Sequence, residues 1–227
     1  MKNICIIPAR GGSKRVPRKN IKDFLGKPII AYSIEAALKS NLFDEVMVST
    51  DDKEIASIAK QYGAKVPFLR SAETANDFAT TADVLLEVLT KYRERGVEFD
   101  TLCCLYATAP FVKAERLIEC YGLLQGDVDS AFTVVEYSYP IQRSLVCNGK
   151  LIQMAYPEHK NSRSQDLTKH YHDAGQFYFS AVKNVENNKC LWGEHTAPLI
   201  LSELEVQDLD TLTDWQLAEM KYKMLHE

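Results

Sequence analysis

The fold is decided by residues 4–20, which read ICIIPARGGSKRVPRKN. The apolar run at residues 4–7 predicts a buried strand, so the glycine-rich basic segment after it is a loop that leaves the strand's end. In α/β folds, ligands bind at this edge of the sheet. Six of the thirteen residues at 10–22 are Lys or Arg, in a chain of net charge -4. The loop is therefore expected to bind a compact polyanion.

Length and composition limit the class of protein. A chain of 227 residues with 46% hydrophobic content can form one large α/β domain, and we expect a single domain over residues 1–227. The mild net acidity argues against a nucleic-acid surface, which needs basic residues over a whole face. No apolar run approaches the roughly 18 residues of a membrane span, and no signal-peptide pattern is seen. We expect a cytoplasmic protein that binds neither nucleic acid nor membrane.

The cysteines and histidines give no metal signal. The six cysteines show no C-x-x-C spacing, and Cys5, Cys103 and Cys104 lie in apolar, strand-like runs. This pattern favours buried thiols in a reducing compartment over zinc ligands or disulfides.

Strand-like and helix-like segments alternate after the loop. Strands are expected at residues 4–7, 45–50, 65–68, 101–106 and 130–135, and helices at residues 30–38, 55–62, 84–92 and 117–124. The alternation predicts an α/β fold with a mostly parallel central sheet and helices on both faces. Further strands are expected at residues 176–181 and 197–206. A helix at residues 211–225 would close the fold, with Trp215 and Tyr222 as its packing anchors.

Residues 137–167 interrupt this alternation. The segment is polar and irregular, it contains Pro140 and Pro157, and its Asn148-Gly149 pair is a hairpin signal. It predicts an excursion that protrudes from the sheet.

The basic loop has the chemistry of a triphosphate site. Glycines let the backbone approach an anion, backbone N–H groups can surround it, and Lys or Arg neutralise its charge. The loop contains neither G-x-G-x-x-G nor G-x-x-x-x-G-K-[ST], which argues against NAD-binding and P-loop proteins. A solvated basic turn is the alternative, and it is disfavoured because Arg10 follows a buried strand directly.

Three segments resemble the cytidylyltransferases that make CMP-activated nonulosonic acids. They are IPARGGSK at residues 7–14, PRKN at residues 17–20 and GKP at residues 26–28. The resemblance continues through VSTD at residues 48–51, LR at residues 69–70, DFATT at residues 77–81 and DLD at residues 208–210, and so covers nearly the whole chain. It implies a Rossmann-like nucleotidyltransferase fold. It also implies that CMP passes from CTP to the anomeric hydroxyl of a nine-carbon 2-keto sugar acid, with release of pyrophosphate.

The same resemblance assigns roles in nucleotide binding. Arg10, Ser13 and Lys19 would hold the phosphates, in a loop that includes Gly11 and Gly12. The residues expected around the cytosine and ribose are Pro8, Ala9, Asn20, Arg70, Ala79 and Thr81, with Asp77 in the same nucleotide-contact segment. Attack on the α-phosphate develops negative charge, which a fixed guanidinium or ammonium stabilises in the transition state. We therefore expect Arg10 and Lys19 to be catalytic.

Asp208 and Asp210 form a candidate metal pair. They are two residues apart, so in extended backbone both carboxylates face one side and can share a cation. Mg²⁺, or Mn²⁺ in its place, commonly takes one or two carboxylates together with phosphate oxygens. The alternative is that Asp210 caps the helix that follows. The triphosphate loop in the same chain favours the metal, and no general base is evident.

The acceptor segments depart from those of the sialic-acid members of this family. Those members carry QPTSP where residues 106–110 read YATAP, and NG[AS]IY where residues 174–178 read AGQFY. Replacing Gln by Tyr106 suits an acceptor with fewer hydroxyls and more apolar substituents. Residues 106–110 and 171–178 most resemble the corresponding segments of family members that act on pseudaminic acid, which has a 9-deoxy end and two acylamino groups. N-acetylneuraminic and legionaminic acids are the alternative acceptors.

We expect the acceptor to be held by residues from these segments and by one cation. Arg163 is the candidate for its carboxylate, with Lys160 and Lys169 as rivals. The other expected acceptor contacts are Tyr106, Ala107, Thr108, Gln176 and Tyr178. The resemblance further implies a homodimer in which residues 137–167 reach across to the partner.

Two other functional classes stay open at this point. A D-x-D pair also serves glycosyltransferases that use nucleotide-sugar donors, although here the pair lies late in the chain. A regulatory module would bind CTP without metal-dependent turnover.

Overall fold

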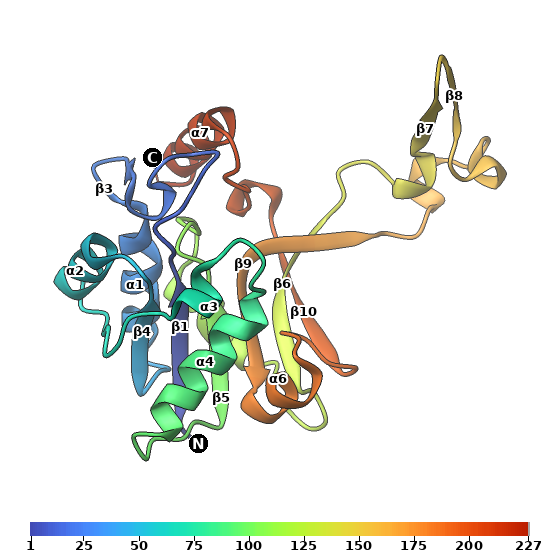
Figure 1. The fold of residues 1–227 in the computed structure, drawn as a ribbon. Helices are drawn as coiled ribbons and strands as arrows, with labels where there is room; N and C mark the ends of the chain where they lie inside the picture. The colour runs from blue at the N-terminus through green and yellow to red at the C-terminus, as the bar shows by residue number, and fades with distance from the viewer. Residues whose placement is uncertain (227) are drawn as a thin grey trace.

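The computed structural model describes residues 1–226, which are built around one six-stranded sheet (Figure 1). The strand order is β10-β6-β9-β5-β1-β4. These strands are β1 (Asn3–Pro8), β4 (Glu45–Ser49), β5 (Thr101–Leu105), β6 (Ser130–Glu136), β9 (Tyr171–Ala181) and β10 (Thr196–Leu201). β1 is parallel to β4 and β5, and β6 is parallel to β10, whereas β9 runs antiparallel between β5 and β6. The expected mostly parallel sheet is confirmed, with β9 as its one reversed strand among the described residues.

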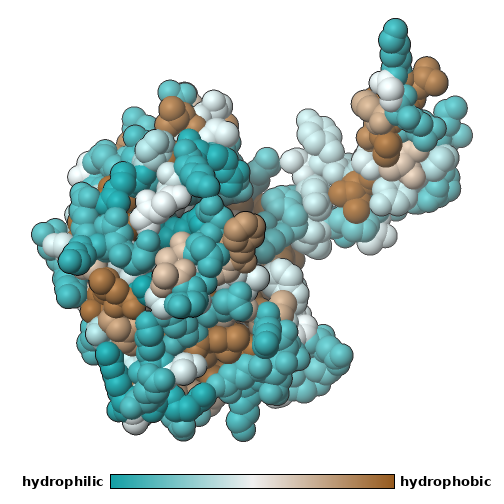
Figure 2. Space-filling model, in the orientation of Figure 1, coloured by the Kyte–Doolittle hydropathy of each residue, from teal (hydrophilic) through white to brown (hydrophobic). Residues whose placement is uncertain are grey.

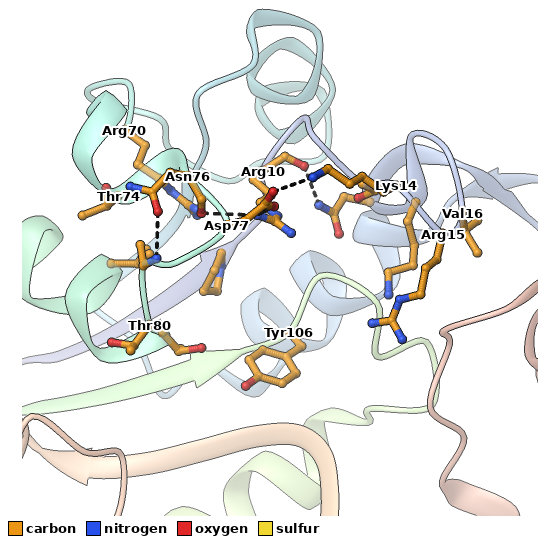
Figure 3. Close-up of a pocket in the computed structure, with 17 residues that line it drawn as sticks. Arg10, Lys14, Arg15, Val16, Arg70, Thr74, Asn76, Asp77, Thr80 and Tyr106 are labelled. Carbon is orange, nitrogen blue, oxygen red and sulfur yellow. Dashed lines mark hydrogen bonds and ion pairs between the residues drawn. The ribbon is translucent and has the colours of Figure 1, made fainter.

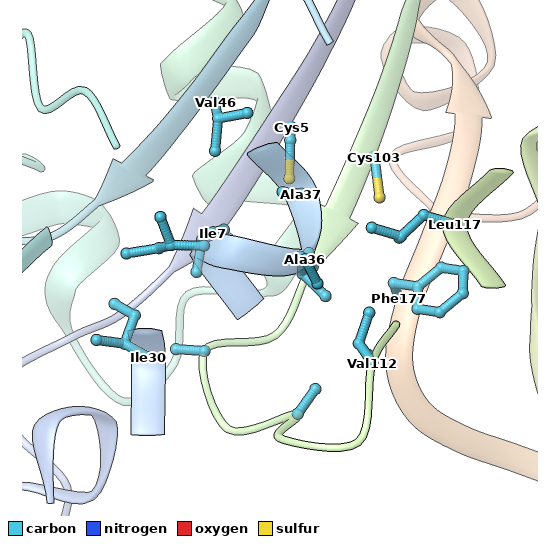
Figure 4. Packing of buried hydrophobic residues seen from close by; sticks show 14 of the residues in the cluster. Cys5, Ile7, Ile30, Ala36, Ala37, Val46, Cys103, Val112, Leu117 and Phe177 are labelled. Atoms are coloured by element: carbon cyan, nitrogen blue, oxygen red, sulfur yellow. The ribbon is translucent and has the colours of Figure 1, made fainter. Parts of the chain in front are cut away.

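Helices cover both faces of the sheet, as expected. On one face lie α1 (Ile29–Ser40), α2 (Lys53–Gln61) and α5 (Ala114–Tyr121), and on the other lie α4 (Thr81–Arg93) and α6 (Val182–Asn188). The buried side chains of β1 alternate between the two layers. Cys5 and Ile7 pack with the first group of helices (Figure 4). Ile4 and Ile6 pack with the second group. A strand buried on both faces explains the continuous apolar run in the sequence.

None of the helices within residues 1–226 combines the length and the apolar character that crossing a bilayer requires.

The last helix, α7 (Leu212–His226), packs beside the start of α1 through a small aromatic cluster. Phe24, in the short hairpin of β2 (Asp23–Phe24) and β3 (Lys27–Pro28), makes edge contacts with Tyr32, Trp215 and Tyr222 at centroid distances of 5.5 to 5.6 Å. Such contacts stabilise beyond the area they bury. Trp215 and Tyr222 are therefore the packing anchors that the sequence predicted.

The prediction of a strand at residues 65–68 is wrong. Lys65 makes only an isolated parallel bridge to Met47 at the edge of the sheet. Pro67 has no N–H group to continue the pairing, so the ladder stops there. The chain then passes through the short helix α3 (Ala72–Ala75) before α4 begins.

Other expected elements have different bounds; the strand expected at residues 176–181, for example, is β9, which begins at Tyr171. The strand expected at residues 197–206 ends at Leu201, because Ser202 starts a 3₁₀ turn over Glu203–Glu205 and the two ends of that turn cap each other. The helix expected at residues 117–124 is α5, which begins three residues earlier and ends at Tyr121.

The excursion is a protrusion that stands away from the body of the molecule (Figure 1). It carries the hairpin of β7 (Leu145–Asn148) and β8 (Leu151–Met154), joined by a turn at Gly149, whose φ of +62° favours glycine. Its base is a stalk in which the first residues of β9 pair with the end of β6, with Tyr171 opposite Glu136. The expected excursion and hairpin are both confirmed.

Candidate functional site

A cavity of about 320 Å³ opens where β1 and β5 end (Figure 3). Its walls are the basic loop after β1, the segment from residue 70 to the first turns of α4, and the residue that follows β5. This is the edge of the sheet at which the sequence placed a ligand site. The lining residues are Pro8, Arg10, Ser13, Lys14, Arg15, Val16, Lys19, Asn20, Arg70, Thr74, Asn76, Asp77, Ala79, Thr80, Thr81, Val84 and Tyr106.

Many of the residues predicted from sequence meet in this cavity. Those that line it are Pro8, Arg10, Ser13, Lys19, Asn20, Arg70, Asp77, Ala79, Thr81 and Tyr106. Ala9, Gly11 and Gly12 belong to the same loop but are not among the described residues that line the cavity. Ala9 is buried, and its N–H donates to the Ser49 carbonyl at 2.9 Å, which ties the loop to the end of β4.

The basic loop is fastened to the N-terminus of α2. The Gly11 N–H donates to Asp51 Oδ1 at 3.0 Å. A Cβ atom at Gly11 would lie 2.8 Å from Asp52 Oδ2, so only glycine fits without displacing that carboxylate. Further along, the Arg18 guanidinium pairs with both Asp52 and Glu54. The glycine therefore serves a close approach of loop to helix.

Asp52 joins the loop to the helix electrostatically. Its Oδ1 accepts hydrogen bonds from the N–H groups of Glu54 at 2.8 Å and Ile55 at 3.0 Å, which caps α2. The hydrogen bond from Arg18, together with those backbone donors, lowers the pKa of Asp52 to about 2 despite partial burial. The same contact raises the pKa of Arg18. Both groups are therefore charged at neutral pH.

One pair of cations on the loop is bridged by a carboxylate from the opposite wall. Arg10 Nη1 lies 2.7 Å from Asp77 Oδ1, and Lys14 Nζ lies 2.6 Å from Asp77 Oδ2 (Figure 3). Lys14 and then Arg10 hold the pKa of Asp77 below its usual range. Asn20 braces the loop from within, because its Nδ2 donates to the Arg10 carbonyl at 2.9 Å.

Arg70 is a buried cation in the cavity wall. It is 8% exposed, and its Nε and Nη2 donate to the side chain and carbonyl of Ser49 at 3.1 and 2.6 Å. Burial lowers its pKa, yet a guanidinium stays protonated in proteins. The result is a positive charge whose orientation is fixed before any ligand binds.

A second pair of cations meets the predicted metal residues. Lys19 Nζ donates to the Leu209 carbonyl at 2.8 Å and lies 3.4 Å from Asp210 Oδ1. Arg15 Nη1 lies 2.5 Å from Asp210 Oδ2. The fold thus brings Asp210 to the basic loop across about 190 residues of sequence. Asp208 is exposed, and its Oδ1 accepts from the Leu209 N–H at 2.8 Å.

The cap of α7 is not made by Asp210. Thr211 Oγ1 accepts from the Asp214 N–H at 3.2 Å, and Asp214 Oδ2 accepts from the Thr211 N–H at 2.7 Å. These reciprocal bonds form a capping box. The carboxylate of Asp210 is turned to the basic loop instead, which removes the capping alternative raised by the sequence.

The predicted acceptor residues are only partly brought together. Tyr106 lines the cavity, and its ring lies 5.5 Å from that of the buried Tyr178. The Tyr178 hydroxyl donates to Asp173 Oδ2 at 2.7 Å, while the Gln176 amide donates to the Glu205 carbonyl. Burial raises the pKa of both tyrosines. Tyr178 therefore packs against Tyr106 without being one of the described residues that line the cavity.

The other predicted acceptor residues lie elsewhere. Arg163 is on the protrusion, where its Nε pairs with Asp166 at 2.8 Å. Ala107 is buried in the core beneath α1. The predicted acceptor residues that are not among the described lining residues are Ala107, Thr108, Arg163, Gln176 and Tyr178, and the predicted metal residues Asp208 and Asp210 are not among them either.

Sequence reasoning missed several lining residues. Lys14 and Arg15 belong to the basic run but were given no individual role, although both line the cavity and form ion pairs, with Asp77 and Asp210 respectively. Thr74 and Asn76 come from the segment around α3, where the sequence has no periodic signal. Asn76 could have been found from its position before Asp77, because Asn in such a segment often forms a turn with its own backbone.

Comparison with known proteins gives consistent matches. A family model described as "Cytidylyltransferase" matches residues 4–139. The chain is 45% identical over 229 residues to a pseudaminic acid cytidylyltransferase of Campylobacter jejuni, covering 100% of this chain and 99% of that protein. It is 36% identical over 236 residues to a CMP-N,N'-diacetyllegionaminic acid synthase of Legionella pneumophila, with 100% and 99% covered. The structure of a CMP:2-keto-3-deoxy-manno-octonic acid synthetase complexed with CTP has the same fold, with a TM-score of 0.70 at 22% identity and 100% and 99% covered.

Proposed function

This chain belongs to the cytidylyltransferase family, and from that premise we propose that it transfers CMP from CTP to pseudaminic acid. The anomeric hydroxyl oxygen of the acceptor would bond to the α-phosphorus as the bond to the bridging oxygen breaks, and pyrophosphate would leave. The observation that carries the proposal is the ring of five Lys and Arg side chains around one cavity at the carboxyl end of β1.

The charges of the cavity fit a triphosphate. Arg10, Lys14, Arg15 and Lys19 come from one loop, while Arg70 projects from the opposite wall and is fixed by Ser49. A fixed cation stabilises charge that develops on the α-phosphate without reorganising during the reaction. We assign this role to Arg10 and Lys19, as the sequence predicted.

We also propose that a magnesium ion binds at Asp208 and Asp210. Asp208 and Asp210 offer only oxygen ligands, which Mg²⁺ prefers, and it usually completes its shell with water and phosphate oxygens. The ion pairs of Asp210 with Arg15 and Lys19 put a carboxylate beside the loop that would hold the phosphates. A bound Mg²⁺ or Mn²⁺ would neutralise phosphate charge and lower the pKa of the attacking hydroxyl.

Tyr106 supports pseudaminic acid as the acceptor. Its ring faces the cavity and is backed by Tyr178, so the acceptor wall is aromatic at the position where sialic-acid members of the family carry an amide. An aromatic wall suits a sugar with a deoxy end, because a buried amide would lose its partner there. Legionaminic and N-acetylneuraminic acids are the competing acceptors.

An acceptor panel tests this assignment. The protein, CTP and Mg²⁺ are mixed separately with pseudaminic, N,N'-diacetyllegionaminic and N-acetylneuraminic acids, and pyrophosphate release is followed. We expect kcat/KM to be highest for pseudaminic acid. Tyr106→Gln should reduce the ratio of kcat/KM for pseudaminic acid to kcat/KM for N-acetylneuraminic acid. Tyr106→Phe, which keeps the ring, should leave that ratio unchanged. Faster turnover of N-acetylneuraminic acid by the unmodified protein would refute the assignment.

We also propose a homodimer formed through the protrusion. The apolar side chains of its hairpin are exposed, including Leu151 at 77% and Ile152 at 61%. Figure 2 shows brown, hydrophobic surface on the protrusion below its teal tip. Exposed apolar residues gathered on one projection are typical of an interaction surface. In such a dimer Arg163 would enter the partner's cavity and pair with the acceptor carboxylate.

We place the protein in the cytoplasm on the chemistry of its thiols. All six cysteines are free, and four of them are buried. Free thiols of this kind persist where the surroundings are reducing.

A further inference from the structure

Asp77 forms ion pairs with Arg10 and Lys14, two of the cations proposed to bind the phosphates of CTP. Its two carboxylate oxygens each accept from a different cation, Oδ1 from Arg10 at 2.7 Å and Oδ2 from Lys14 at 2.6 Å. The Asn76 carbonyl adds a contact to Arg10 at 3.3 Å. Figure 3 shows the carboxylate lying between the two cations at the cavity. Two oxygens held by two cations in this way resemble two oxygens of a phosphate group.

A carboxylate and a phosphate cannot occupy this position together. Both would use the same N–H donors of Arg10 and Lys14, and two anions in contact repel each other strongly. For a triphosphate to receive these cations, the carboxylate of Asp77 must move aside. The charge of Asp77 therefore opposes phosphate binding, although the residue itself lies in the nucleotide-contact segment.

The local structure lets Asp77 move without disturbing the fold. On one side Asn76 Oδ1 accepts from the N–H groups of Phe78 at 2.7 Å and Ala79 at 2.9 Å, which forms a tight turn. On the other side the capping box of Thr80 and Asp83 fixes the start of α4. Between these anchors Phe78 is 94% exposed, so its side chain does not pack against the body of the protein and does not restrain Asp77. A rotation of the Asp77 side chain breaks only its two ion pairs.

We propose that Asp77 competes with a phosphate of the nucleotide for Arg10 and Lys14, so that it limits triphosphate affinity and helps to displace pyrophosphate after transfer. This inference rests on the proposed function. Its consequence is that Asp77 weakens binding in the ground state, which raises KM for CTP and speeds product release. Removing its charge should therefore make the phosphates bind more tightly.

The binding test uses isothermal titration calorimetry in the presence of EDTA, so that no metal bridges the anions. CTP, tripolyphosphate and cytidine are titrated into the unmodified protein and into Asp77→Asn. Glu73→Gln is the matched control, because Glu73 is an exposed carboxylate on α3 that makes no contact with the loop cations. Asp77→Ala is a second variant that removes the side-chain oxygen as well as the charge.

We expect both Asp77 variants to bind CTP and tripolyphosphate about threefold to tenfold more tightly, as the loss of two exposed ion pairs allows. Cytidine affinity should be unchanged, and Glu73→Gln should behave as the unmodified protein. Inhibition by pyrophosphate in the Mg²⁺-dependent reaction should strengthen by a similar factor. Equal or weaker binding of CTP by both variants would overturn the inference. If the unmodified protein bound neither CTP nor tripolyphosphate, with EDTA or with Mg²⁺ in its place, the proposed function itself would fail instead.

Discussion

At the scale of single residues, the two adjacent glycines of the basic loop have different surroundings. A Cβ at Gly11 would meet Asp52 Oδ2 at 2.8 Å, whereas one at Gly12 would have no heavy atom within 4 Å. We expect Gly11→Ala to lower the free energy of unfolding by about 1–3 kcal/mol, because it displaces the carboxylate that caps α2. Urea denaturation measures the change. Gly12→Ala is the control for stability and should lie within about 0.5 kcal/mol of the unmodified protein.

Asp52 should make stability depend on pH in the acid range. Its pKa is about 2 in the folded protein, against about 4 in an unfolded chain. The lowered pKa stabilises the fold fully above about pH 4, and this contribution is lost as the pH falls towards 2.

Denaturation at several pH values tests this dependence on Asp52. Between pH 6 and pH 3 we expect Asp52→Asn to lose less stability than the unmodified protein, by about 1 kcal/mol, since the amide keeps the cap but not the charge. Parallel pH profiles for the two proteins would show that Asp52 does not contribute.

At the scale of elements, α7 determines where the predicted metal residues lie. Trp215 anchors the helix against Phe24, and Leu209 is buried in the same cluster, so the segment that carries Asp210 is held beside Lys19. We expect Trp215→Ala to cost about 3–5 kcal/mol of stability, which the cavity it leaves explains.

The kinetics of CMP transfer test whether α7 also positions Asp210. Trp215→Phe should cost less stability than Trp215→Ala, so most of the protein stays folded. If α7 positions Asp210, Trp215→Phe should still raise KM for CTP or the Mg²⁺ concentration needed for half-maximal activity. Leu217→Ala on the exposed side of α7 is the matched control and should change neither quantity. Unaltered kinetics of the Trp215→Phe protein would show that the packing of α7 does not determine the position of Asp210.

The elements also show how far sequence could predict this fold. Strands β1, β4, β5 and β6 have continuous apolar runs because both of their faces are buried, and the helices between them have a clear period. The direction of β9 could not be predicted, because alternation within a strand is the same whichever way the strand runs. The cavity was predicted at residues whose chemistry is unusual, such as Arg10 and Lys19. Thr74 and Asn76 were missed because their role depends on where α3 ends.

At the scale of the whole molecule, the proposed dimer would build each acceptor site from two chains, because the protrusion of one would reach the cavity of the other. Arg163 lies on the protrusion, while Asp210 lies in the body and pairs with Lys19, which lines the cavity. Mixing inactive Arg163→Ala with inactive Asp210→Asn should therefore restore activity in the mixed dimers. With random exchange, about one quarter of the full activity is expected, because half of the dimers carry one complete site of two.

Two measurements check this complementation. Sedimentation should show a dimer, and Leu151→Lys with Ile152→Lys should convert it to a monomer, because charges on the hairpin oppose its burial. Substituting Met220→Lys, exposed on α7, should leave the dimer intact. No recovery of activity in a mixture whose subunits are shown to exchange would place Arg163 outside the partner's cavity.

The reversed strand β9 also governs the order in which this protein can fold as it is synthesised. It lies between β5 and β6, yet it leaves the ribosome after both of them. Until β9 is available, β5 and β6 each present an unpaired edge, and such edges pair readily with other chains. A nascent chain of the first 139 residues therefore has nearly every residue proposed to bind phosphate, but its sheet still lacks β9 and β10. We therefore expect the nascent chain to be prone to aggregation until β9 has been synthesised.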